Sequence, residues 1–351
     1  GLAYLPKLIT DSLGWTRPVR SAAADGVPAR LRNAVGPDVH AAGANAVPFE
    51  QRLELATGML RNLGLVEDFA RIVAICGHAS EMVNNPYRAG YDCGACGGHS
   101  GEPNARVAAA ILNDQAVRQG LAERGIVIPA DSWFVPAVHV TTTDEIRFLD
   151  TAGMPAAHAA IFPVVERWMA TAGAATRQER SRRLGAEVPP LESIDPMTAA
   201  KAAALAEADV LRRSHDWSEV RPEWGLAGNA AFIIAPRSRS IGLDLGGRTF
   251  MHSYDHSRDP EGTVLELIMT APMIVTSWIN LQYYASAVDN RAFGSGNKLI
   301  HNVTGQLGVL LGNGGDLMTG LPWQAVSNGR ELVHEPLRLT VVIEAGRPAV
   351  A

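Results

Sequence analysis

The stretch that decides the fold reads Ile72-Val73-Ala74-Ile75-Cys76-Gly77-His78. Its run of apolar residues predicts a buried β-strand, and the change in composition after Ile75 predicts the point at which that strand ends. Open α/β sheets place their functional sites at the carboxyl ends of strands. His78 is therefore the first residue of a candidate site.

The loop after this strand carries two of the three cysteines, Cys93 and Cys96, which form a Cys-x-x-Cys. Thiolates and imidazole are ligands that zinc prefers, and the loop is long enough to bring His78 and Cys93 onto one ion. In an alternative interpretation, Cys76, His78, Cys93 and Cys96 close a structural zinc site with no open position for chemistry. An ordinary loop or a redox pair is the remaining alternative.

Composition limits the class of protein. The chain has 351 residues, of which 47% are hydrophobic, and this is sufficient for a substantial core. The net charge is −5, and no run of lysine and arginine with interleaved aromatics appears, so nucleic-acid binding has no support. Three cysteines do not make a disulfide framework in a chain of this length and suit a reducing compartment. We expect a globular protein that faces the cytosol.

Hydrophobic periodicity predicts an α/β fold in four consecutive segments. These are an Ala-, Gly- and Pro-rich amino-terminal segment at 1–48, an α/β region with the metal loop at 49–154, a helical insertion at 155–215, and an α/β completion of the same domain at 216–351. Within them we expect helices at 49–63, 103–124, 156–184, 196–213 and 263–287, and strands at 70–76, 133–140, 231–235, 309–311 and 337–344. The strand, helix, strand order around the loop is typical of α/β folding.

The longest apolar stretch runs from Leu265 to Tyr284, but Glu266, Pro272 and two amides interrupt it. A membrane-spanning helix needs roughly 20 nearly uninterrupted apolar residues. We therefore expect no transmembrane segment, although peripheral attachment stays open. The first residues lack an initiator methionine and the pattern of a signal peptide, so we expect a piece of a longer protein.

Other motifs offer weaker candidates for a site. His252 and His256 are four positions apart and could share a helix face as metal ligands, or belong to a hydrogen-bonded loop. The glycine-rich stretches at 305–308 and 312–315 lack the features of a phosphate loop or a dinucleotide fingerprint, so nucleotide binding is not expected. No Gly-x-Ser-x-Gly elbow supports serine hydrolase chemistry.

Many short motifs are distributed along the chain. They include Gly77-His78-Ala79-Ser80, Asn84-Asn85-Pro86, Asp92-Cys93-Gly94-Ala95-Cys96-Gly97-Gly98, Pro103-Asn104-Ala105-Arg106, Thr141-Thr142-Thr143-Asp144, Arg221-Pro222-Glu223-Trp224-Gly225, His252-Ser253-Tyr254-Asp255 and Trp278-Ile279-Asn280-Leu281-Gln282. Together these motifs resemble the DabA family of inorganic-carbon transporter subunits. The resemblance extends over most of the chain but covers only the carboxyl half of such proteins.

This resemblance implies a β-carbonic-anhydrase-like mixed sheet flanked by helices, with a helical insertion. Such proteins hold zinc with two cysteines, an aspartate and a histidine, and one cysteine and the aspartate come from a Cys-x-Asp-x-Arg motif that this chain lacks. Motif matching transfers His78 and Cys93 as zinc ligands, and does not transfer Cys76 or Cys96. No catalytic residue is assigned, and the chain alone is expected to be incomplete as an enzyme.

The resemblance also implies a function. Zinc would lower the pKa of water so that hydroxide attacks CO2 and gives bicarbonate. This hydration would be coupled to ion flow through a DabB-like integral membrane subunit, with the chain peripheral on the cytoplasmic side of the inner membrane. Alternatives are a soluble carbonic-anhydrase-like enzyme completed by another chain, and a non-enzymatic domain with a structural zinc. Asp92, Asp144, His139 and the Glu223-Trp224 loop are candidates for gating or for orienting the ligands, or are turn formers and core hydrogen-bonders.

Overall fold

Two strands that run in parallel form the centre of the candidate site. In the computed structural model, β1 (Ile72–Ala79) pairs with β2 (Trp133–Val140) in a register that joins Ile72 to Trp133 and Ala79 to Val140. A short strand, β3 (Glu145–Phe148), turns back antiparallel to β2 and completes a sheet of order β1-β2-β3. Both predicted strands are present. The prediction that the first strand is buried and ends before His78 is wrong, because its pairing with β2 continues to Ala79 and residues 72–78 are only partly buried or exposed, so His78 lies within β1.

The structure describes part of the chain. The described residues are 2, 5–13, 36–40, 47–81, 91–92, 96, 99–184, 196–214, 228–293, 310–311, 316–317, 321, 323–335 and 337–346. Cys93 and the Glu223-Trp224 loop lie outside them, as does most of the predicted amino-terminal segment. The division into four segments stays a prediction.

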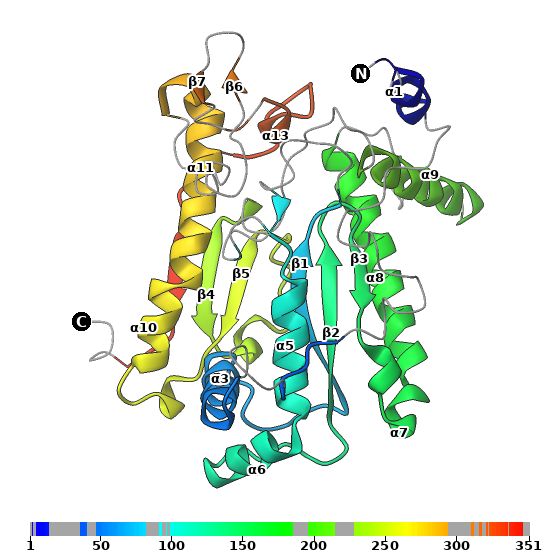
Figure 1. Cartoon of the computed structure of the whole chain (residues 1–351). Coiled ribbons are helices and arrows are strands. Elements are labelled where there is room, and N and C mark those ends of the chain that lie inside the picture. Colours follow the sequence, from blue (N-terminus) through cyan, green and yellow to red (C-terminus); the bar gives the residue numbers. More distant parts are fainter. Residues whose placement is uncertain are drawn as a thin grey trace.

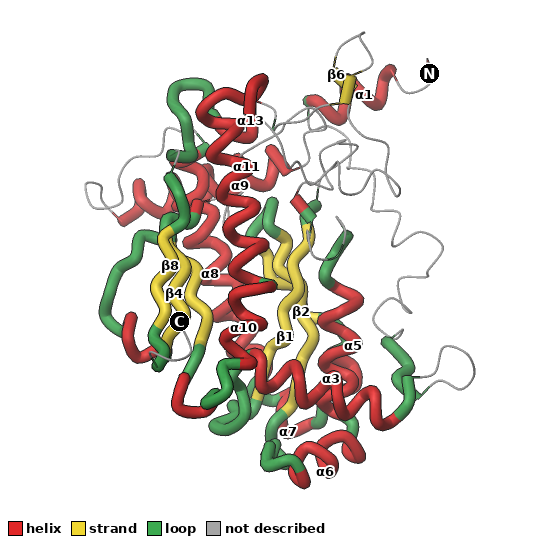
Figure 2. Tube along the Cα trace, turned by 90° about the vertical axis from the view of Figure 1, so that its left-hand side faces the viewer, coloured by secondary structure: helices red, strands yellow, loops and turns green. Residues whose placement is uncertain are grey.

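Helices α3 (Phe49–Asn62), α5 (Glu102–Asn113) and α6 (Gln115–Glu123) cover one face of this sheet. Figures 1 and 2 show α5 alongside β1 and β2, with α3 and α6 beside it. The buried side chains of this core include Leu53, Ala56, Leu60, Ala109, Ile111, Leu112, Val117, Leu121 and Phe134. Burying a side chain of the larger kinds contributes roughly 1.5–3 kcal/mol, so this face anchors the strands that end at the site.

The single helix predicted at 103–124 is wrong, because the chain breaks at Asp114. Asp114 is extended, with φ −67° and ψ 121°, and its carboxylate accepts hydrogen bonds from the backbone N–H groups of Ala116 and Val117. Aspartate competes well for such a capping position, which offsets the cost of ending one helix and starting another. The apolar periodicity continued across the break and concealed it.

The helical insertion forms α7 (Ala156–Ala159), α8 (Phe162–Arg183) and α9 (Pro196–Ser214). Helix α8 packs against β3 and against α9, and Figure 1 shows it along the β3 edge of the sheet. Phe162 of α8 meets Phe148 of β3 edge to face, with ring centroids 4.9 Å apart. Helices predicted at 156–184 and 196–213 are thus confirmed, apart from the short break before α8.

A second sheet has the order β5-β4-β8, with all strands parallel. Its strands are β4 (Ala231–Ala235), β5 (Thr249–Ser253) and β8 (Thr340–Ile343), and β8 lies at an edge within the predicted strand at 337–344. The helix predicted at 263–287 is present as α10 (Thr263–Thr270) and α11 (Pro272–Phe293), which are separated at Ala271 because proline disrupts a helix interior. The remaining elements are α1 (Leu5–Ser12), β6 (Leu310–Leu311), β7 (Asp316–Leu317), α13 (Trp323–Val326), and 3₁₀ turns at Thr151–Gly153, Arg237–Ser240 and His256–Arg258.

The fold is therefore mixed α/β, with small sheets flanked by helices. One expectation fails in the second sheet. His252 lies in β5 and His256 begins a 3₁₀ turn, so the two do not share the face of a helix and cannot act as paired ligands of that kind. The segment that contains His252 forms a strand and not a helix because it pairs with β4, where Phe250 stacks on Phe232 with ring centroids 4.8 Å apart.

One helix among the described residues, Thr263–Asp289, is long and apolar enough by composition to cross a membrane. Its residues Leu265 and Ile268 are buried in the core of the second sheet with Phe232 and Ile234. A core helix passes the same test of length and composition, and the expectation that the chain has no spanning segment stays a prediction.

Candidate functional site

The candidate site lies where β1 and β2 end together. Because the strands are parallel and in register, His78 of β1 is directly beside His139 of β2. Residues paired in this way project from the same face of a sheet, on strands about 5 Å apart. Sequence analysis named both histidines, and the pairing between their strands makes them neighbours.

His78 has the properties expected of a metal ligand. The Nδ1 atom of its ring is buried and has no hydrogen-bond partner among the described residues. A buried imidazole nitrogen without a partner is unfavourable unless a donor or a metal ion completes it. His78 therefore fits a zinc ion through its lone pair, and the site's remaining predicted ligand, Cys93, lies outside the described residues.

The start of α5 approaches this strand end very closely. The backbone N–H of Gly101 donates to the carbonyl oxygen of His78 at 2.8 Å. A Cβ atom at Gly77 would lie 2.5 Å from the carbonyl oxygen of Gly101, so only glycine permits the contact. The amino terminus of α5 therefore lies at the end of β1 on the face that Gly77 presents, opposite to the face that carries the His78 side chain.

Asp92 ties the start of the cysteine loop to the end of β1. Its Oδ1 atom accepts hydrogen bonds from the backbone N–H of Ser80 at 2.6 Å and from the Ser80 hydroxyl at 3.0 Å. Asp92 immediately precedes Cys93 in the sequence, and Ser80 comes two positions after His78. The contact therefore fixes the residue before one predicted ligand near the strand that carries the other.

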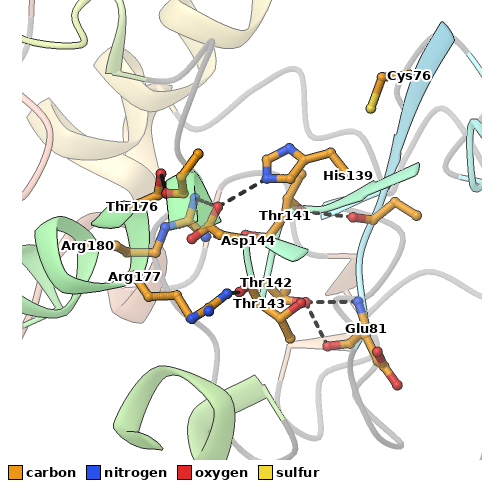
Figure 3. Close-up of polar contacts among 12 residues, drawn as sticks. Cys76, Glu81, His139, Thr141, Thr142, Thr143, Asp144, Thr176, Arg177 and Arg180 are labelled. Atoms are coloured by element: carbon orange, nitrogen blue, oxygen red, sulfur yellow. Dashed lines mark hydrogen bonds and ion pairs between the residues drawn. The ribbon is translucent and has the colours of Figure 1, made fainter. Parts of the chain in front are cut away.

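A buried cluster of charged side chains lies next to His139. Figure 3 shows Asp144 between the ring of His139 and the guanidinium of Arg180. The Oδ1 atom of Asp144 lies 3.1 Å from Nε2 of His139 and 3.2 Å from Nη2 of Arg180. Asp144 is 2% exposed, and a carboxylate so deeply buried needs a cationic partner of this kind.

Helix α8 holds the turn in which Asp144 lies. Arg177 donates to the carbonyl oxygen of Thr143 at 2.9 Å, and Arg180 donates to that of Thr141. Asp144 itself has a left-handed backbone with φ 54°, a conformation that aspartate adopts more readily than most residues. A Cβ atom at Gly173 would lie under 3.0 Å from the carbonyl oxygen of Asp144, so glycine allows the helix to approach.

The other predicted ligands do not join this arrangement. Among the residues that the structure describes, no three His, Cys, Asp or Glu side chains form a group that could hold a metal ion, although Cys76, His78 and Cys96 are all described. Cys76 lies on β1 apart from the charged cluster (Figure 3). Desolvation by burial raises the pKa of its thiol, and this effect outweighs a hydrogen bond with the backbone of His139 that lowers the pKa. Cys96 accepts a hydrogen bond from Asn104.

Sequence reasoning missed the residues that come from the helical insertion. Arg177, Arg180 and Gly173 belong to an Ala- and Arg-rich helix whose sequence gives no sign of a neighbouring site. One signal was present: charged residues on the face of α8 toward the sheet are unusual unless they have buried partners. Their partners are carbonyl oxygens, Asp144 and, for Arg177, the carboxylate of Glu207 on α9, which only the folded chain brings within reach.

The fold and site define an α/β protein with two neighbouring histidines at the carboxyl ends of two parallel strands, close to the start of a helix. The sequence profile of the family described as "Probable inorganic carbon transporter subunit DabA" matches residues 1–351. The chain belongs to this family. No solved structure matches it.

Individual relatives agree with the family match. The chain is 54% identical over 354 residues to the probable inorganic carbon transporter subunit DabA of Chloroflexus aurantiacus, covering 100% of this chain and 41% of the relative. It is 53% identical over 349 residues to that of Roseiflexus sp. (strain RS-1), covering 98% and 40%. DabA 2 of Bradyrhizobium sp. (strain ORS 278) is 51% identical, covering 100% and 40%. The chain thus spans about two fifths of the length of these relatives.

Proposed function

We propose that this chain is the part of an inorganic-carbon transporter subunit that supplies half of a zinc site for CO2 hydration. The observation that carries the proposal is the buried Nδ1 of His78, without a partner among the described residues, at the carboxyl end of a parallel strand. The names of the relatives support a role in inorganic carbon transport.

In this proposal His78 and Cys93 hold zinc, together with ligands from outside this chain. Bound zinc would lower the pKa of a water molecule and supply hydroxide for attack on CO2 near neutral pH. The chain's own residues set the geometry: Gly77 allows α5 to approach, and Asp92 fixes the start of the cysteine loop on Ser80. Each restraint reduces the freedom that a ligand would lose on binding the ion.

We further infer that hydration is coupled to ion flow through an integral membrane partner of the DabB type, with this subunit at the cytoplasmic side of the inner membrane. The family is described as a transporter subunit, which supports assembly with another polypeptide. The soluble enzyme completed by a second chain is the alternative. Purification of the protein from solubilised membranes distinguishes the two alternatives. Only the transporter subunit should co-purify with a membrane protein in fixed stoichiometry.

The structural-zinc alternative receives less support. Its three described members, Cys76, His78 and Cys96, do not form a metal-ligating group within the described part of the chain. In addition, Cys96 accepts a hydrogen bond from Asn104.

Metal analysis tests the proposed ligands. The protein expressed from its complete gene should contain about one zinc per chain, and His78→Ala and Cys93→Ser should each lose it. The matched variants Cys76→Ser and Cys96→Ser should retain it. Equal loss of zinc from all four variants would favour the structural site, and an absence of zinc from the wild type would refute the proposal.

A further inference from the structure

The hydrogen-bond partner of His139 determines which nitrogen of its neutral ring carries the hydrogen. An ionised carboxylate accepts hydrogen bonds and a guanidinium donates them. Nη2 of Arg180 forms an ion pair with the Oδ1 atom of Asp144 at 3.2 Å, and the same oxygen lies 3.1 Å from Nε2 of His139. Nε2 must therefore carry the hydrogen, which leaves Nδ1 of the neutral ring as an acceptor.

This acceptor belongs to the side chain next to His78 in the sheet. His139 is paired in register with His78, so both rings project from the same face of the sheet. The His139 side chain is 36% exposed, which leaves it accessible to a small ligand, whereas Asp144 behind it is 2% exposed. No described residue hydrogen-bonds to its Nδ1.

Three neighbouring polar side chains have hydrogen-bond partners within the protein, and the two atoms of this cluster without a partner among the described residues, Oγ1 of Thr143 and Oδ2 of Asp144, are buried away from solvent. The hydroxyl of Thr141 donates to the carbonyl oxygen of Ala79, and Ser80 donates to Asp92. Thr142 exchanges hydrogen bonds with the backbone of Glu81. Nδ1 of His139 is thus the acceptor that this cluster presents to a ligand beside His78.

An acceptor at this position distinguishes ligands of identical shape. Hydrogen carbonate and nitrate are both planar trigonal anions, but hydrogen carbonate has an O–H group and nitrate has none. A site that hydrogen-bonds a ligand hydroxyl rejects the analogue that lacks it, since its own polar group is then left without a partner.

We propose that His139 is a specificity-determining residue whose Nδ1 accepts a hydrogen bond from the O–H group of hydrogen carbonate bound beside His78, with Asp144 and Arg180 as positioning residues that hold the accepting tautomer. This inference rests on the proposed function, because it takes the ligand from it. It adds the reason that hydrogen carbonate would be selected over other small anions.

Competition between the two anions tests the inference. In the zinc-loaded protein from the complete gene, ¹³C-labelled hydrogen carbonate is bound at pH 8 and displaced with nitrate, with the ¹³C line width as the readout. The wild type should prefer hydrogen carbonate, and His139→Ala should reduce that preference roughly tenfold, the value of one hydrogen bond. The matched control His256→Ala, on an exposed 3₁₀ turn, should leave it unchanged.

Variants of Asp144 separate orientation from simple structural support. Asp144→Asn should keep the preference, because its amide oxygen can still accept from both Arg180 and His139 and asparagine tolerates the left-handed backbone. Asp144→Ala should lose it to the same extent as His139→Ala. Nitrogen-15 NMR of the wild-type protein should show the hydrogen of His139 on Nε2, and a hydrogen on Nδ1 would overturn the assignment.

The possible failures are distinguishable. An unchanged preference in His139→Ala, or a loss of zinc from that variant, overturns the role assigned to His139. Zinc-loaded wild type that binds both anions equally also overturns it while leaving the zinc site intact. Wild type without zinc refutes the proposed function itself. If Asp144→Ala fails to fold, His139→Ala and Asp144→Asn still decide the result.

Discussion

Because α8 approaches the turn at Asp144 closely, replacing glycine by alanine should lower the stability of the protein at Gly173 and raise it at Gly58. Gly173 lies in α8 and Gly58 in α3, and both are replaced by alanine. Alanine in a helix interior is favoured over glycine by about 1 kcal/mol. At Gly58 nothing lies within 4 Å of the added Cβ, so this gain should appear in full as increased stability.

At Gly173 the added Cβ meets the carbonyl oxygen of Asp144. The contact would be under 3.0 Å, whereas ordinary van der Waals contact begins at 3.4 Å, so α8 or the turn must move by more than 0.4 Å. Inserting a methyl group into packed structure of this kind typically costs 1–3 kcal/mol. After the gain in helix propensity, Gly173→Ala should be destabilised by about 1 kcal/mol, and the two variants should differ by about 2 kcal/mol.

Urea unfolding followed by circular dichroism measures this difference. The midpoint should rise for Gly58→Ala and fall for Gly173→Ala, with equal slopes. Displacement of the turn should also lengthen the contact between Asp144 and His139, so Gly173→Ala should show a weaker preference for hydrogen carbonate over nitrate. If Gly173→Ala is stabilised as much as Gly58→Ala, the close approach of α8 does not exist in the protein.

Three further predictions concern the strand end and the second sheet. Gly77→Ala should destabilise by about 1–3 kcal/mol and reduce zinc retention, since its Cβ would meet Gly101; equal zinc content would contradict this. Asp259 accepts from two backbone N–H groups of α10 and from the buried Tyr254 hydroxyl, so Asp259→Ala should lose about 2 kcal/mol in urea unfolding and Asp259→Asn less. Burial raises the pKa of Asp259, but these hydrogen bonds outweigh it and lower the pKa, so the stabilisation is present above the ordinary pKa and is lost as pH falls through the lowered value. Wild type should therefore lose more stability than Asp259→Asn on acidification. Burial and the bond to Asp259 raise the pKa of Tyr254 to about 12, so one tyrosine should titrate late in ultraviolet absorbance, and earlier in Asp259→Ala.

The sequence predicted the parts of the fold that depend on local pattern. The strand at 133–140 and the helix beginning at residue 49 were placed closely, because a continuous apolar run and a 3.6-residue period are properties of neighbouring residues. Pro272 likewise separated α10 from α11, since proline disrupts a helix wherever it stands in the interior. By contrast, β3 and β5 were missed, because they are short and gain their stability from the strands beside them.

The candidate site divides in the same way. The sequence by itself identified His78, His139 and Asp144, since polar residues at the carboxyl ends of apolar runs are visible in the chain. Tertiary structure alone decided that His78 and His139 are neighbours, that Arg180 neutralises Asp144, and that Gly173 allows the helix to come so near. Those relations depend on strand register and helix packing, which are set by the burial of side chains distant in sequence and leave no local signal in the residues that they bring together.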